Sequence, residues 1–119
     1  MNRFGLDESK WQAAKAEAKT ILIERARRGD PIAYSELVKG IHTFSLEPHD
    51  IRLFDLIGEI STEESAAGRG MLSALVVTIG ENKPGAGFFE LAKQLGYDVK
   101  DQDTFWDAEV KRVCAAWRK

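Results

Sequence analysis

The residues of this chain that could act together in acid–base chemistry are His49, Asp50, Glu64 and Arg69. A carboxylate beside an imidazole can orient the ring and raise its pKa, so His49 next to Asp50 is suggestive. Adjacent residues seldom point at each other, however, and Asp50 is well placed to cap a helix. On a continuous helix with a rise of about 1.5 Å per residue, His49 and Glu64 would lie roughly 20 Å apart. An enzyme built on His49, Glu64 and Arg69 therefore stays an alternative. It requires a sharp bend at Ser61, and we assign no catalytic residue.

Other reactive side chains form weaker patterns. His42 and His49 are seven residues apart across a proline-containing loop, which matches no standard spacing of metal ligands. Ser73 stands in an apolar run without the glycines of a nucleophile elbow. Cys114, the single cysteine, falls on the apolar face of the last expected helix, where packing explains it better than nucleophilic chemistry. The sequence therefore predicts neither a metal site nor a cofactor.

Four basic residues are candidates for contacts with DNA phosphates or with a protein partner: Arg69, Lys83, Arg25 and Arg28. Solvation of ordinary surface charges is the simpler explanation for all of them. The segment that contains the helix after Asp50 is acidic, because residues 31–68 hold two Lys or Arg against seven Asp or Glu. Acidic side chains that face phosphates repel them and release no counterions. This argues against insertion of the helix after Asp50 into the DNA major groove.

Length and composition favour one domain over residues 1–119. The chain has 119 residues, of which 44% are hydrophobic and 30% charged, and a formal net charge of −2. This composition supports a single core and is not that of a disordered tail. One cysteine fits a reducing compartment, and no run approaches the roughly 20 apolar residues of a membrane helix. The start also lacks the apolar run of a secretory signal. We therefore expect a soluble cytoplasmic protein without membrane contact.

Apolar spacing and turn residues predict helices around a short β element. Residues 72–77 are too few and too β-branched for a helix, and Phe88 and Phe89 begin either a partner strand or the next helix. The expected elements are a helix over 8–28 capped by Asp7 and ended by Gly29, a strand over 32–34, a helix from Ser35 to Ile41, a helix begun by Asp50, a strand over 72–77, a turn over 84–87, a helix ended by Gly96, and a helix capped by Asp103 or Thr104.

Two local patterns refine the helix begun by Asp50. Ser61 and Glu64 match a capping box, in which each side chain bonds the other's backbone N–H, so a kink or a fresh helical turn is expected there. Leu53, Phe54, Ile57 and Ile60 are expected to share one apolar face.

This order of elements is that of a winged helix-turn-helix domain, in which a minimal first strand pairs with the two strands of a wing. The expected fold class is α+β, mainly helical and winged-helix-like, with about five helices and a small two- or three-stranded β-sheet. Residues 8–95 would form the winged-helix-like core. The helix over 103–118 would pack on that core, with Trp106 and Trp117 as anchors.

Several runs also resemble a family of small uncharacterised bacterial proteins. They are GRGMLSALVV over 68–77, PGAGFFELA over 84–92 and the Phe105-Trp106 pair. Residues 34–37 and 47–50 extend the similarity over most of the chain after the first helix. The resemblance implies a bacterial, cytoplasmic origin and no particular activity.

These observations predict a noncatalytic binding module. A small winged-helix regulator that binds duplex DNA is the first hypothesis, and a protein–protein interaction adaptor on the same fold is the close alternative. The basic region 1–30 and the acidic region 31–68 would also permit a homodimer. Trp11 and Trp117 could then be shared between subunits, although burial within one core explains them as well. A small-molecule enzyme ranks third.

Overall fold

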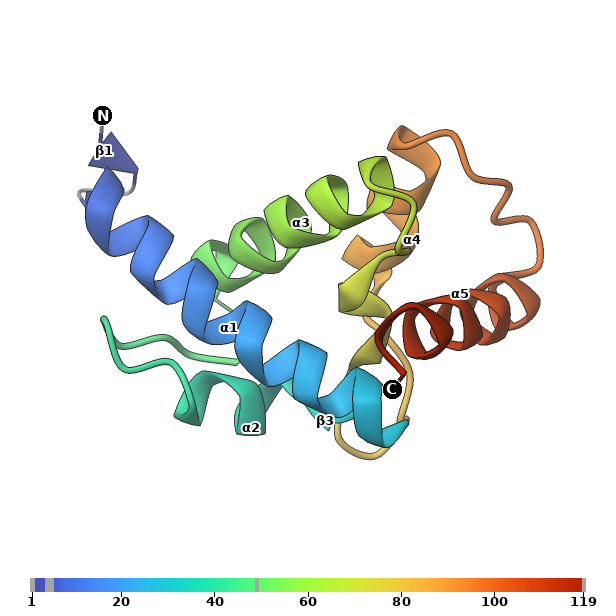
Figure 1. Ribbon diagram of the computed structural model, residues 1–119, viewed down its shortest axis with the longest axis horizontal. Helices are drawn as coiled ribbons and strands as arrows, with labels where there is room; N and C mark the ends of the chain where they lie inside the picture. The colour runs from blue at the N-terminus through green and yellow to red at the C-terminus, as the bar shows by residue number, and fades with distance from the viewer. Residues whose placement is uncertain (1, 4–5, 49, 119) are drawn as a thin grey trace.

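The computed structural model describes residues 2–3, 6–48 and 50–118. Helices dominate this part of the chain (Figure 1). Its α-helices are α1 (Glu8–Arg28), α2 (Tyr34–Lys39), α3 (Ile51–Ala66), α4 (Ala86–Gln94) and α5 (Gln102–Trp117). Its other elements are β1 (Asn2–Arg3), β2 (Leu6–Asp7), β3 (Ile32–Ala33), the 3-10 helix η1 (Leu72–Leu75) and β4 (Val76–Val77). The expected class, mainly helical α+β with about five helices and a small sheet, is confirmed.

The first helix has the bounds that its apolar spacing predicts. Trp11, Ala14 and Ala18 lie on the buried face of α1, and Trp11 is fully buried within the single chain. Asp7 precedes the helix in an extended conformation but makes no side-chain cap bond. Gly29 ends the helix with φ 74°, a left-handed conformation that a side chain would strain. Both ends of α1 therefore lie where Asp7 and Gly29 predicted them, although Asp7 forms no cap bond.

The expected caps at Ser35 and at Ser61 with Glu64 are wrong. The second helix begins one residue before Ser35, and its N-cap is Ala33 without a side-chain bond. The capping box at Ser61 and Glu64 is not formed, because α3 runs unbroken from Ile51 to Ala66. Both side chains are instead buried and bond residues beyond the helix. Asp50, by contrast, caps α3 as predicted, and its Oδ1 accepts the Arg52 backbone N–H at 2.9 Å.

The predicted strand over 72–77 is wrong for its first four residues, which form η1. Side chains from α3 and α5, instead of a neighbouring strand, form hydrogen bonds with the backbone groups of residues 71–74. Glu109 Oε2 accepts the Met71 N–H at 2.8 Å, Ser61 Oγ accepts the Ser73 N–H at 2.9 Å, and Trp106 Nε1 donates to the Ala74 carbonyl at 2.8 Å. Backbone groups that are satisfied in this way do not need a β ladder.

The strand pairing also differs from that of a wing. β4 pairs with β3 in parallel, with Ile32 opposite Val76 and Ala33 opposite Val77, and β1 pairs with β2 in a separate antiparallel hairpin. After β4 the chain makes a turn in which Lys83 O accepts the Thr78 N–H at 2.9 Å. Phe88 and Phe89 then belong to α4. Within the described residues, the sheet that contains β4 has two strands and no returning wing strand.

The predicted cap of α5, Asp103 or Thr104, is wrong because both residues lie inside the helix, which begins at Gln102. Asp101 is its N-cap, and the Asp101 Oδ1 accepts the Thr104 N–H at 3.1 Å. η1 lies at the centre of the molecule, in contact with α1, α3 and α5 (Figure 1). Two apolar clusters flank it, one around α1 and α3 and one around α4, and Val110 of α5 packs against both. No helix in the described ranges combines the length and the apolar character needed to cross a bilayer.

Candidate partner-binding groove

Arg69, the first of the predicted basic contacts, follows α3 and is held against a buried carboxylate. Its Nε and one terminal nitrogen donate to the two carboxylate oxygens of Glu64, at 2.8 and 2.7 Å. The guanidinium also lies over the Trp117 ring, 5.5 Å from its centroid. A bidentate pair of this kind fixes the arginine in one orientation. Arg69 therefore contributes to the packing of α3 against α5.

The other three predicted contacts are also paired with carboxylates. Lys83 Nζ lies 3.4 Å from Asp103, and the Arg28 guanidinium lies 3.3 Å from Asp30. Arg25 pairs with Glu36 and donates to the Pro31 carbonyl at 2.7 Å. The four cations thus belong to three segments: the C-terminal end of α1, the chain after α3, and the turn before α4.

The residues of the enzyme hypothesis do not form a reactive cluster in the described structure. Glu64 is only 1% exposed, and the Arg69 guanidinium, followed by Lys19 at 3.3 Å, holds the pKa of its carboxyl below the usual value. The unbroken α3 also lacks the bend that this hypothesis requires. His49 lies outside the described residues. Glu64 is thus a buried structural counter-ion.

The other candidate nucleophiles and ligands are also accounted for by packing. Ser73 is buried, and its Oγ accepts a hydrogen bond from Ser61 at 2.6 Å. Cys114 is half-buried in the first apolar cluster, and burial raises the pKa of its thiol. Among the residues that the structure describes, no three His, Cys, Asp or Glu side chains converge as metal ligands.

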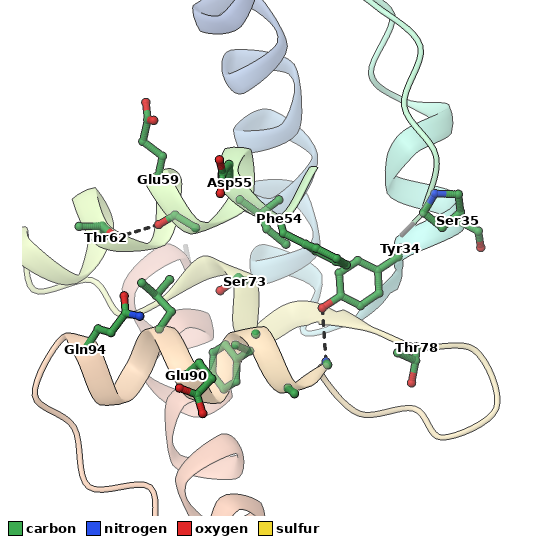
Figure 2. Close-up of a pocket in the computed structure, with 18 of the residues that line it drawn as sticks. Tyr34, Ser35, Phe54, Asp55, Glu59, Thr62, Ser73, Thr78, Glu90 and Gln94 are labelled. Atoms are coloured by element: carbon green, nitrogen blue, oxygen red, sulfur yellow. Dashed lines mark hydrogen bonds between the residues drawn. The ribbon is translucent and has the colours of Figure 1, made fainter. Parts of the chain in front are cut away.

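A groove of about 1180 Å³ opens between α3 and α4 (Figure 2). Its walls are helical, its far end is formed by the start of α2 and the turn before α4, and Ser73 lies between the two walls. The lining residues are Tyr34, Ser35, Pro48, Phe54, Asp55, Ile57, Gly58, Glu59, Thr62, Glu63, Ser73, Thr78, Ile79, Gly85, Ala86, Gly87, Phe88, Glu90, Leu91 and Gln94.

The inside of the groove is largely apolar. Phe54, Ile57 and Leu91 line it, and Phe54 remains 44% exposed. Ile79 at the rim is 75% exposed. Gly58 lies where α3 comes close to α4, because a Cβ built there would meet the Leu91 Cδ2 of the opposite wall at 3.6 Å. Neighbouring apolar side chains that stay exposed in a concave surface are typical of a binding site.

Two aromatic rings close one end of the groove. Tyr34 and Phe54 meet edge to face, with ring centroids 5.8 Å apart and an interplanar angle of 88° (Figure 2). The Tyr34 hydroxyl accepts the Gly85 N–H at 3.4 Å, which ties the start of α2 to the start of α4. Burial raises the pKa of the Tyr34 hydroxyl. This end is therefore built from segments about fifty residues apart in the sequence.

Carboxylates stand along both walls. Asp55, Glu59 and Glu63 come from α3 and Glu90 from α4, and among the residues that the structure describes no Lys or Arg lines the groove. Figure 2 shows that Glu59 projects from the side of α3 that faces away from α4. Glu59 and Glu63 share the ammonium of Lys15 from α1, with a distance of 2.8 Å to Glu59. Burial opposes the charge on Lys15, yet its hydrogen bonds to the two carboxylates outweigh burial and raise its pKa. Asp55 and Glu90 are exposed and make no ion pair within the described ranges.

The sequence of α3 contains one signal for this groove. Leu53, Ile57 and Ile60 share the buried face of the helix as predicted, but the prediction is wrong for Phe54, which is half-exposed. An apolar residue outside the buried face of a helix indicates a second apolar contact beyond the core. Three acidic residues of the same helix, Asp55, Glu59 and Glu63, line that contact.

Comparisons with family models, with curated proteins and with solved structures gave no match for this chain. The resemblance to a family of small bacterial proteins stays a prediction. Any function must therefore be argued from the groove and its charges.

Proposed function

We propose that the protein is a noncatalytic interaction module that holds a segment of another protein in the groove between α3 and α4. The observation that carries this proposal is the groove itself, with half-exposed Phe54 inside it and carboxylates on both walls. Its volume of about 1180 Å³ exceeds the roughly 300–1,000 Å³ of most small-molecule sites. A polypeptide segment fits this size and this largely apolar lining better than a metabolite does.

DNA binding by a small winged-helix regulator is the second candidate. It is favoured by the exposure of the Lys83 and Arg69 side chains, 55% and 42%. The pairing of both residues with carboxylates weighs against it, because a paired cation must exchange partners before it can neutralise a phosphate. Origin in a bacterium, location in the cytoplasm and assembly as a dimer stand with these proposals as expectations from sequence.

The proposal is tested by selecting peptides of about 16 residues from a random phage-displayed library on the full chain. Selected peptides are then measured by fluorescence anisotropy on the wild type, Gly58→Ala and Gly58→Trp. A methyl group at position 58 makes only an ordinary contact with Leu91 at 3.6 Å, whereas an indole has no room towards Leu91 and must project into the groove. We expect Gly58→Trp to weaken binding at least tenfold and Gly58→Ala to change it less than about twofold.

Phe54→Ala is a second groove variant, because a half-exposed side chain can be truncated with little risk to folding. Circular dichroism confirms that each variant folds. A library that yields no binder, or binders that ignore both groove variants, would overturn the proposal. So would tight binding of a labelled duplex of about 24 base pairs in low salt that is lost in Arg69→Glu or Lys83→Glu, and that result would establish the DNA candidate.

A further inference from the structure

We infer that the segment held in the groove is a cationic amphipathic α-helix, with its apolar side chains in the groove and Lys or Arg along both of its edges. This inference rests on the proposed function and specifies the chemistry of the partner. It combines three features: the spacing of the wall carboxylates, the shortage of cations that neutralise them, and the helical walls.

The carboxylates of the α3 wall form one row. Asp55, Glu59 and Glu63 are spaced four residues apart, so they lie above one another on the same side of the helix. Eight residues at about 1.5 Å each give this row a length of roughly 12 Å. Glu90 and Gln94, also four residues apart, lie on the α4 wall. The groove therefore has a polar edge on each side and apolar side chains between the edges.

The negative charge of these edges is only partly neutralised inside the molecule. Lys15 serves both Glu59 and Glu63, and Glu63 remains 51% exposed. Asp55 and Glu90, on opposite walls, are left for solvent or for a partner. A neutral or acidic occupant would desolvate or repel these groups, whereas Lys or Arg side chains would pair with them. The charge pattern therefore selects a cationic occupant.

The walls favour a helical occupant over an extended one. Strand addition requires a run of unpaired backbone groups along a sheet edge, and β3 and β4 offer only two residues each. The groove presents side chains of two helices, among them Phe54, Ile57 and Leu91. A helix inserts apolar residues at i, i+3, i+4 and i+7, which cover roughly 10 Å and match the length of the acidic row. Residues beside that stripe then face Asp55 on one wall and Glu90 on the other.

Four synthetic peptides of about 16 residues test the inference on the full chain by fluorescence anisotropy. All carry Leu at helical i, i+3, i+4 and i+7 spacing. The flanking positions are Lys, Gln or Glu, and a fourth peptide has the Lys flanks with a central Pro. We expect the Lys peptide to bind best, the Glu peptide to bind at least thirtyfold more weakly, and the Pro peptide about tenfold more weakly because proline breaks a helix.

Charge variants of the protein show which carboxylates cause the preference for the Lys peptide. Asp55→Lys and Glu90→Lys should each weaken the Lys peptide about fivefold, as expected for reversal of an exposed ion pair, and the double variant should prefer the Glu peptide. Glu24→Lys is the matched control, because Glu24 is exposed on α1 outside the groove and undergoes the same change of charge. We expect it to act less than about twofold.

The outcomes that overturn this inference can be distinguished from those that overturn the proposed function. If library peptides bind in the groove but are acidic, neutral or extended, the inference is overturned and the proposed function stands. If no peptide responds to Gly58→Trp or Phe54→Ala, both are overturned. If sedimentation shows self-association that Gly58→Trp abolishes, the occupant is a second copy of this chain and the inference is again overturned. Equal effects of Glu24→Lys and Asp55→Lys would show unspecific charge attraction and count against it as well.

Discussion

The carboxylates buried in the core and those exposed on the groove walls serve two different purposes. Glu64 and Glu109 are each 1% exposed: Lys19 of α1 and Arg69 pair with Glu64, and Glu109 of α5 accepts the Met71 N–H before η1. Asp55 and Glu90 are exposed on the groove walls and make no ion pair in the described part of the chain. A buried carboxylate must be paired or hydrogen-bonded to be tolerated, whereas an exposed one is free to meet a partner. Burial and pairing, rather than residue type, separate structural acids from recognition acids here.

The strongest test of the structural side is Glu109→Ala. Glu109 accepts the buried Met71 N–H at 2.8 Å and lies 3.5 Å from the Arg112 Nε, so it joins α5 to the chain that enters η1. Truncation leaves that N–H without its partner and opens a cavity. We expect the free energy of unfolding to fall by about 3 kcal/mol in urea denaturation.

Asp107→Ala is the control on the same helix. Asp107 and its partner Lys111 are both largely exposed, with 3.0 Å between them, so its loss should change stability by less than about 0.5 kcal/mol. Peptide binding in the groove should be unchanged in both variants. Equal stability losses at positions 107 and 109 would contradict the distinction between buried and exposed acids.

Acid titration gives a smaller effect on the same side of the molecule. Arg69, with Lys19, lowers the folded-state pKa of Glu64 below its usual 4.5. The stability from this ionisation is fully present above pH 4.5 and is lost as the pH falls through the lower folded-state pKa. Glu64→Gln lacks this ionisation at every pH. At pH 7 the variant should therefore have a lower free energy of unfolding than the wild type, by a smaller amount than Glu109→Ala loses.

The difference between Glu64→Gln and the wild type should shrink as the pH drops below 4.5. Urea denaturation at pH 7, 5, 4 and 3 measures both proteins in parallel. A gap that stays constant over this range would show that the charge of Glu64 contributes nothing to stability.

The parts of the fold that sequence predicts are those in which local signals decide. A long apolar stripe fixed α1, and a cap residue fixed the start of α3 at Asp50. η1 could not be predicted, because its backbone partners Ser61, Trp106 and Glu109 belong to helices distant in sequence. Local β propensity points to a strand when such tertiary bonds are invisible. The same long-range bonds drew Ser61 and Glu64 away from the expected capping box.

The groove was harder to predict than the fold. Its walls, α3 and α4, are separated in the sequence by residues 67–85, and its closed end joins Tyr34 to Gly85. Four basic residues were predicted from the sequence as binding contacts, yet each of the four is paired with a carboxylate in the structure. Binding capacity depends on which charges lack an internal partner, and that is decided only by the folded arrangement.

The smallest expected effect concerns the groove side, through Gly58→Ala. Glycine in a helix interior is less favourable than alanine by roughly 0.5–1 kcal/mol, and the added Cβ would meet Leu91 at an ordinary contact distance of 3.6 Å. The variant should therefore be more stable by about that amount, whereas Glu109→Ala loses stability. Thermal and urea denaturation measure the change. A gain in stability with peptide binding preserved would show that folding tolerates a larger residue at position 58. It would also show that the groove next to this residue remains open to the partner. A loss of stability would instead mean that α3 and α4 are already packed too closely for the groove to admit a helix.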